Sequence, residues 1–200
     1  MKTLIDYLNL EKIIVIGHSM GAATIFNYVN QFGCEKLEKI VVADMSPYMR
    51  NGVWEGGIGQ GKWTDENFFA DLDKIFDDAG EFAWNVSKNL INPALKNIPE
   101  EIVPVMKNTF GSACDTLTCA SLWYSLFRTD NRPAIKKITV PLLYLMPENP
   151  LYSTVTTDFI KNNMKNKFYL EKNFTGTTHQ ILMEQPKLTA DAVKKFIKHI

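Results

Sequence analysis

The sequence predicts an α/β fold in which helices flank a mostly parallel sheet and a helical block is inserted between two of the strands. Three observations support this class. Four β-branched residues at 13–16 lead through a serine flanked by glycines into a segment with helical apolar spacing. Apolar runs of strand length recur at 39–43, 138–146 and 167–170. Between the first two of these runs lies a long stretch without strand character.

The N-terminal part is expected to form a strand–helix–strand unit. Leucine and isoleucine at helical spacing over 2–10 predict a short amphipathic helix, and the apolar run at 13–17 predicts a buried parallel strand. The helix after Ser19 is expected to stop at Gly33. The second strand, at 39–43, should then lie beside the first, because parallel strands joined by a helix form a right-handed unit.

Residues 46–137 are expected to form a helical cap across the carboxyl edge of the sheet, inserted into a core made of 1–45 and 138–200. The segment opens with a glycine-rich loop that could act as a lid hinge. An independent all-helical domain is the alternative. Helical spacing is found near 65–78, 80–91, 99–110 and 115–128.

The C-terminal part returns to alternation of strand and helix. Strands are predicted at 138–146 and 167–170, with a helix at about 153–164 between them. A final amphipathic helix is predicted from about Pro186 to the end. This order completes the parallel sheet.

Composition narrows the classes of partner. The 22 Lys and Arg balance the 22 Asp and Glu without a basic block, which argues against nucleic acid or a membrane and favours a small-molecule substrate. No apolar run approaches the roughly 20 residues that span a bilayer, and the N-terminus lacks a signal peptide, so we expect a cytoplasmic protein. Cys34, Cys114 and Cys119 lack metal-ligand spacing, and neither a metal nor another cofactor is expected. The sequence leaves the oligomeric state open.

The serine turn carries the strongest chemical signal. Gly-x-Ser-x-Gly, centred on Ser19, joins a strand to a helix so tightly that the serine needs a strained backbone, with Gly17 and Gly21 leaving room for both elements. The hydroxyl then stands at the carboxyl edge of the sheet. There the helix that begins at Met20 offers free N–H groups and the positive end of its dipole. The pattern predicts a nucleophile, and an ordinary N-cap serine is the alternative.

A nucleophilic serine needs a base and a carboxylate to orient that base. Of the three histidines, His18 should point away from Ser19, and His199 ends the last helix. His179 follows a strand in a polar loop, and such a loop lies at the same sheet edge as Ser19. We therefore predict His179 as the base, against the alternative of a surface loop histidine.

Taken together, these motifs resemble the α/β-hydrolase fold, in its esterase-like and lactonase-like group. The resemblance covers essentially all residues outside the cap and keeps the order nucleophile, acid, histidine. It implies an acyl-serine mechanism on a parallel sheet flanked by helices. The segments that carry it are Ile-Val-Ile-Gly-His-Ser-Met-Gly at 14–21, Val-Pro-Leu-Leu-Tyr-Leu at 140–145, Thr-His at 178–179 and Met-Glu-Gln-Pro at 183–186.

The resemblance leaves the acid of the triad open. Asn149 lies closest to the usual Asp position, but an amide cannot carry the compensating charge, and the neighbouring Glu148 could substitute. A subset of similar esterases takes the acid from the end of the preceding strand in an Asp-x-x-Pro setting, which this chain has at 44–47. We therefore predict Asp44, with Glu148 as the alternative.

The oxyanion hole is the second departure from the family. The N–H of Met20 should be one donor, whereas the usual second donor, from an earlier loop, has no counterpart in these 200 residues. Losing one donor lowers turnover by about 10²- to 10³-fold. The strand at 13–17 would also keep an exposed apolar edge. We therefore expect the C-terminal portion of a longer hydrolase, the alternative being a minimal hydrolase that covers this edge with its cap or another chain.

The expected function is hydrolysis of carboxylic esters, lactones or thioesters of small substrates. Trp54 and Trp123 are candidates for lining an acyl pocket, although aromatic residues at helical spacing more often belong to a core. Cofactor-free haloperoxidases and C–C bond hydrolases use the same triad. The alternative from another class is a catalytically silent hydrolase-like protein that binds a ligand or serves as an interaction domain.

Overall fold

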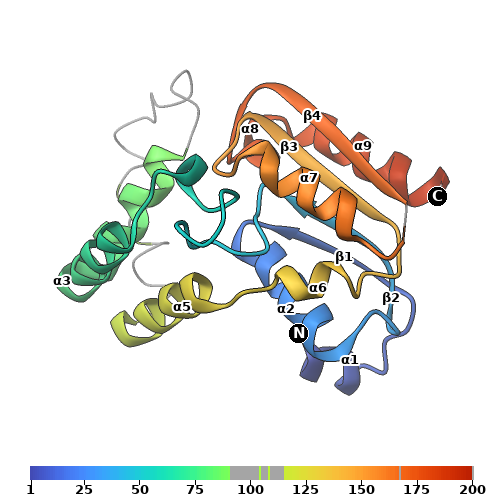
Figure 1. Cartoon of the computed structure of the whole chain (residues 1–200), viewed down its shortest axis with the longest axis horizontal. Coiled ribbons are helices and arrows are strands. Elements are labelled where there is room, and N and C mark those ends of the chain that lie inside the picture. The colour runs from blue at the N-terminus through green and yellow to red at the C-terminus, as the bar shows by residue number, and fades with distance from the viewer. Residues whose placement is uncertain (91–103, 105–107, 109–114, 167, 200) are drawn as a thin grey trace.

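The computed structural model describes residues 1–90, 104, 108, 115–166 and 168–199, and its centre is a four-stranded sheet (Figure 1). All neighbouring strands pair in parallel, and their order in the sheet follows their order in the chain. The predicted fold class and the predicted pairing of the first two strands are therefore confirmed. The strands are β1 (Ile13–His18), β2 (Leu37–Ala43), β3 (Leu142–Asn149) and β4 (Tyr169–Thr178).

Helices connect the strands and cover both faces of the sheet. The region predicted as a helix at 99–110 lies outside the described residues, apart from Pro104 and Asn108. The described helices are α1 (Lys2–Tyr7), α2 (Met20–Phe32), α3 (Asp65–Asn89), α5 (Thr116–Arg128), α6 (Arg132–Ile135), α7 (Thr154–Asn163), α8 (Ile181–Glu184), α9 (Pro186–His199) and the short 3-10 helix Gly59–Gly61.

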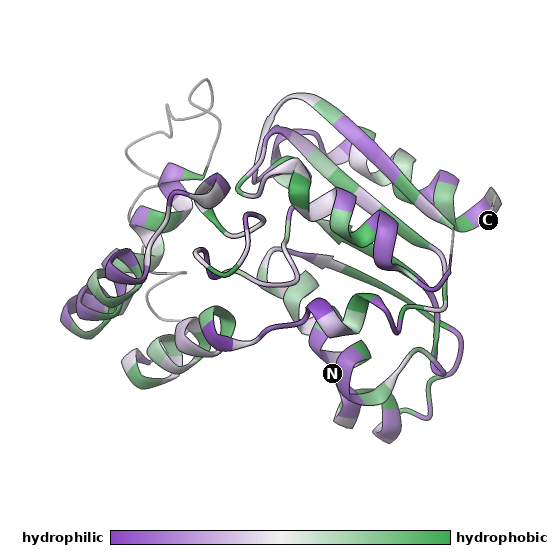
Figure 2. Ribbon diagram, viewed as in Figure 1, coloured by the Kyte–Doolittle hydropathy of each residue, from purple (hydrophilic) through white to green (hydrophobic). Residues whose placement is uncertain are grey.

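The period of two along the strands divides the core into two layers. Ile40 and Val42 of β2 pack in the cluster that also holds buried residues of α2, α6 and α7. Val41 and Ala43, one residue out of step, pack with α8 and α9 on the other face. Figure 2 shows hydrophobic and hydrophilic residues alternating along α7 and α9, as expected of helices with one face on a sheet.

Helices α3 and α5 lie together beyond the end of the sheet at which β1 leads into α2 (Figure 1). They pack against each other through Ile75, Phe82 and Ala120. The two helices predicted at 65–78 and 80–91 form one element, α3, which is broken at Asp78, where the backbone is not helical. The division into core and cap stays a prediction.

Three strand predictions need correction. The strand at 13–17 was expected to be buried with one unpaired edge; β1 does lie at an edge of the described sheet, but it is less buried than expected, with Ile16 52% exposed. The strand predicted at 138–146 begins only after Pro141, which has no N–H for the ladder. At the other edge, β4 extends to Thr178, eight residues past the predicted end. Its middle is polar and exposed, so no apolar run marks it.

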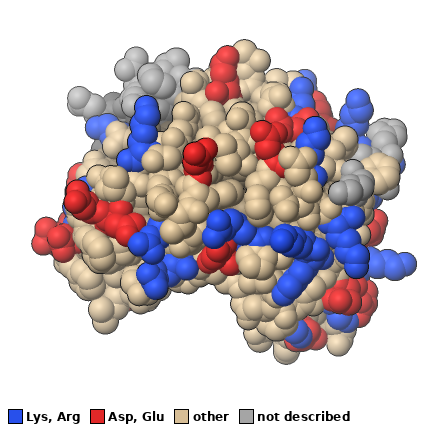
Figure 3. Space-filling model, in the orientation of Figure 1, with Lys and Arg blue, Asp and Glu red and all other residues tan. Residues whose placement is uncertain are grey.

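Acidic and basic side chains are interspersed over the face seen in Figure 3, in keeping with the balanced charge of the sequence. In the part of the chain that the structure describes, no helix is both long and apolar enough to cross a membrane.

Candidate active site

Ser19 occupies a strained turn between β1 and α2. Its φ of 54° and ψ of −125° lie in a region that residues with a Cβ rarely adopt. The turn is held against the next strand by a bond from the Ser19 N–H to the Ala43 carbonyl (3.1 Å). A Cβ at Gly17 would come within 2.6 Å of the Ala22 backbone, so glycine is needed there, whereas a Cβ at Gly21 would meet nothing within 4 Å. The expectation of close approach therefore holds at Gly17 and is wrong at Gly21.

The Ser19 hydroxyl is not used as a helix cap. Ser19 is the N-cap residue of α2, yet its side chain makes no capping hydrogen bond. Met20 is the first residue of α2, where backbone N–H groups have no partner within the helix. A half-buried hydroxyl and free N–H groups therefore share one turn.

The Asp44 carboxylate receives a hydrogen bond from the His179 ring, from Nδ1 to Oδ2 at 2.8 Å. Asp44 directly follows β2, has a φ of 37° and is fully buried, and His179 is 2% exposed. The same Oδ2 accepts the N–H of Leu151 at 2.9 Å. The other oxygen, Oδ1, is buried without a hydrogen-bond partner. A charge buried this deeply strongly favours the hydrogen-bonded position of the ring.

This bond determines which nitrogen of His179 can act as a base. A carboxylate only accepts, so Nδ1 carries the proton and the neutral ring keeps its lone pair on Nε2. The loop that carries the ring is fixed as well, since Glu184 accepts both the N–H and the hydroxyl of Thr178 at 2.7 Å. The ring is thus oriented from two sides.

The alternative acid, Glu148, is not brought to His179. Its carboxylate is exposed and accepts the N–H of Gly176 at 2.6 Å. Asn149, at the position where the family usually has its acid, is the last residue of β3. Of the candidate carboxylates, Asp44 is therefore the one bonded to the predicted base.

His18 connects the serine turn to the His179 loop. Its Nε2 donates to the His179 backbone carbonyl at 2.6 Å, and the two ring centroids are 4.6 Å apart. No hydrogen bond joins the Ser19 hydroxyl to the His179 ring, although both residues lie at this rim. The contact of His18 was not predicted from sequence. His199, the third histidine, ends α9.

Charges and burial around the site shift several pKa values. Burial lowers the pKa of the His18 ring, and the nearby His179 lowers it further. Burial, followed by the charge of Asp44, raises the pKa of the Tyr144 and Tyr152 phenols well above the usual range. Tyr144 remains a neutral phenol that bonds the N–H and carbonyl of Met45, the residue after Asp44.

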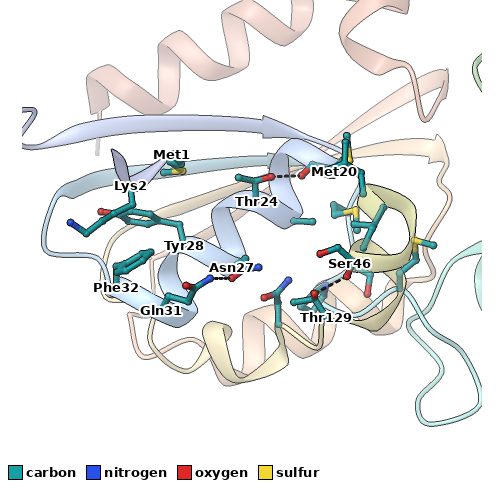
Figure 4. A pocket seen from close by; sticks show the side chains of 18 of the residues that line it. Met1, Lys2, Met20, Thr24, Asn27, Tyr28, Gln31, Phe32, Ser46 and Thr129 are labelled. Carbon is teal, nitrogen blue, oxygen red and sulfur yellow. Dashed lines mark hydrogen bonds between the residues drawn. The ribbon is translucent and has the colours of Figure 1, made fainter. Parts of the chain in front are cut away.

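A cavity of about 340 Å³ runs along α2 from this rim (Figure 4). Its lining includes Met20 and Met45, which directly follow Ser19 and Asp44. Neither tryptophan predicted to line an acyl pocket is among its lining residues. Trp54 packs on Phe159 and borders a separate hollow, and Trp123 packs between α3 and α5. In Figure 4, Met20 and Ser46 lie at one end of the cavity, and Tyr28, Phe32 and Lys2 at the other.

The described residues contain no cluster of three or more His, Cys, Asp or Glu that could hold a metal ion.

No protein-family model matches the chain. A Haemophilus influenzae protein with the provisional name esterase/lipase is 24% identical over 97% of this chain and 63% of its own length. A Synechocystis protein with the provisional name non-heme chloroperoxidase is 27% identical over 72% of this chain and 52% of its own length. The chain thus spans about half to two thirds of the curated relatives it matches.

Solved structures match the fold over nearly the whole chain at low sequence identity. A bromoperoxidase from Bacillus anthracis has a TM-score of 0.84 at 16% identity, covering 98% of this chain and 71% of its own. An esterase from Exiguobacterium antarcticum has a TM-score of 0.82 at 16% identity, with coverage of 98% and 70%. An enol-lactonase from Burkholderia xenovorans has a TM-score of 0.78 at 14% identity, with coverage of 98% and 69%. With its parallel sheet, its strained serine turn and these structural matches, the chain has the α/β-hydrolase fold.

Proposed function

We propose that this chain is a serine hydrolase that cleaves carboxylic esters, lactones or thioesters of small substrates through an acyl-serine intermediate. The observation that carries the proposal is the bond of 2.8 Å between a buried carboxylate, Asp44, and the ring of His179, beside a serine in a strained turn. The similarity to proteins named as an esterase and an enol-lactonase supports an ester or lactone as the bond that is cleaved.

In the proposed mechanism, Ser19 attacks the substrate carbonyl while His179 accepts the hydroxyl proton at Nε2. Asp44 holds the ring in the required tautomer and stabilises the imidazolium that forms. His179 then gives the proton to the leaving group, and a water molecule, activated by the same ring, hydrolyses the acyl-serine. Because Ser19 and His179 are not hydrogen-bonded here, the contact has to form when substrate binds, as often happens at such sites.

The N–H of Met20 is proposed as an oxyanion donor, because it is the first residue of α2 and carries the positive end of the helix dipole. A backbone donor aimed at the forming oxyanion contributes about 10²- to 10³-fold to turnover. Covalent labelling needs only a single attack and is the more sensitive assay.

The cavity along α2 is the proposed place for the acyl or alcohol group. Its volume of about 340 Å³ is at the small end of the range for ligand pockets, which favours small substrates. Three methionine side chains in its lining, Met20, Met45 and Met49, offer an adaptable apolar wall. The cavity turns polar along α2 at Thr24, Asn27 and Gln31.

A fluorophosphonate probe tests the proposal. We expect stoichiometric labelling of the wild-type chain, no labelling of Ser19→Ala and strongly slowed labelling of His179→Ala. Release of p-nitrophenol from its acetate ester should follow the same order. A folded chain that fails to label would contradict the proposal and favour the silent, ligand-binding alternative.

A further inference from the structure

We infer that His18 is a positioning residue for His179, and that its bond to the His179 backbone carbonyl holds the proposed base in register with the proposed nucleophile. The inference rests on the proposed function for its catalytic consequence. Its structural content can be tested separately.

The sheet alone does not bring the two residues together. Ser19 follows β1 and His179 follows β4, and these strands form opposite edges of the four-stranded sheet, with β2 and β3 between them. Neighbouring strands lie about 4.8 Å apart, so the two strands are separated by roughly 14 Å. A side-chain contact has to span this gap at the carboxyl edge.

In the part of the chain that the structure describes, two routes of hydrogen bonds span it. One runs indirectly, from the Ser19 N–H to the Ala43 carbonyl and from Asp44 to the His179 ring. The other is direct, because His18 shares a peptide unit with Ser19 and its Nε2 lies 2.6 Å from the His179 oxygen. A planar peptide leaves few degrees of freedom between residues 18 and 19. The His18 bond therefore restricts the position of the base relative to the turn that carries the hydroxyl.

The direction of the bond suits this role. A backbone carbonyl accepts, so Nε2 of His18 must carry the proton in the neutral ring. Burial and the neighbouring His179 lower the pKa of His18, so the ring stays neutral near pH 7. A neutral ring at 4.6 Å does not oppose the positive charge that His179 acquires when it accepts the serine proton.

A histidine that only fills space would behave differently from one that donates a hydrogen bond. Glutamine places its Nε2 at nearly the same distance from the backbone as histidine does, and it keeps the donor without an imidazole. Leucine fills a similar volume and removes the donor. The pair His18→Gln and His18→Leu therefore separates donation from packing.

The first measurement uses ester hydrolysis and fluorophosphonate labelling. We expect His18→Leu to lower kcat and the labelling rate by about 10- to 100-fold with little change in KM, because a displacement of about 1 Å can cost that much. His18→Gln should restore most of the rate. Equal rates for His18→Leu and wild type, or a His18→Gln as slow as His18→Leu, would overturn the inference.

The second measurement does not depend on activity. In chain labelled with ¹⁵N-histidine, the Nδ1 proton of His179 should exchange faster with solvent in His18→Leu than in wild type, and at the wild-type rate in His18→Gln. If wild type fails to label with the probe while this pattern holds, the proposed function fails and the structural inference stands. Should His18→Leu not fold, His18→Asn replaces it, because its shorter amide cannot reach the carbonyl. Unchanged exchange in the donor-free variant would refute the role of His18.

Discussion

The Asp44 carboxylate and the His179 ring, 135 residues apart in sequence, meet at 2.8 Å in a fully buried contact. One carboxylate oxygen also binds the N–H of Leu151, and the other has no partner. Burial without full hydrogen bonding is costly for a carboxylate, and removing its partner would leave a charge unpaired. A buried carboxylate with one unpaired oxygen is unfavourable as a purely structural element, and this favours a chemical role for Asp44.

Replacing Asp44 by asparagine should nearly abolish the proposed activity. The amide can present N–H to Nδ1, which would favour the wrong tautomer of His179, and we expect kcat to fall by about 10³- to 10⁴-fold. Glu148→Gln is the matched control, because that carboxylate is exposed and bonds Gly176. A substantial loss in Glu148→Gln together with an active Asp44→Asn would show that the assignment of the acid is wrong.

Ser19→Gly should be more stable than Ser19→Ala. Both variants lack the proposed nucleophile, but alanine keeps the Cβ that makes a φ of 54° with ψ of −125° unfavourable. Relief of about 1–3 kcal/mol of strain outweighs the roughly 0.5–1 kcal/mol of chain entropy that glycine loses on folding. The free energy of unfolding in urea should differ by about 1 kcal/mol. A glycine variant that melts below the alanine variant would mean that the turn is not strained.

The two glycines of the serine turn should respond oppositely to alanine. At Gly17 the new methyl would lie 2.6 Å from backbone atoms of Ala22, and neither strand nor helix can yield cheaply, so we expect a loss of about 2–4 kcal/mol. Gly21 lies in the first turn of α2 with free space around it, and alanine there should leave stability unchanged or raise it by up to about 1 kcal/mol. Urea denaturation of both variants checks this. Equal losses of stability in the two variants would mean that the whole turn, and not Gly17 alone, is sterically constrained.

Local patterns were sufficient for much of the fold. The run of β-branched residues before Ser19, the helical spacing after it and the stop at Gly33, whose φ is 74°, all depend on neighbours in sequence. The pairing of β1 with β2 followed from the right-handed connection, and it placed Asp44 beside the serine turn. Rules of strand topology were therefore sufficient to predict that Asp44 lies near Ser19.

Other features depend on contacts that no local pattern carries. The full length of β4 was missed because its exposed edge residues are polar, and α8, with four residues, is too short for a helical period. The bond between His18 and His179 joins residues 161 positions apart. The cavity is lined from several separate segments, so the tryptophans singled out by composition were a poor guide to its walls.

Filling the cavity near the rim should change substrate selection. Thr24 is exposed, lines the cavity and lies one helical turn after Met20. Thr24→Trp should raise KM for p-nitrophenyl octanoate by about tenfold, since about 1.4 kcal/mol of binding is lost, and leave the acetate ester unchanged. Thr24→Val, which removes the hydroxyl without adding bulk, is the control. If acetate and octanoate respond equally to Thr24→Trp, the cavity does not hold the acyl chain.

The pH dependence of the unfolding free energy should reveal the lowered pKa of His18. In the folded chain, burial and then His179 lower this pKa below its usual value of 6.5, while Asp44 opposes the shift. The unfolded chain therefore binds a proton more readily as pH falls through about 6.5, and the folded state loses stability below that pH. His18→Gln lacks this titration and keeps both His179 and Asp44. The difference in unfolding free energy between wild type and His18→Gln, measured in urea from about pH 8 to about pH 5, should be constant at the alkaline end. As the pH falls further, wild type should lose stability relative to His18→Gln. A flat difference, or one that moves in favour of wild type, would mean that His18 is not buried beside His179 in solution.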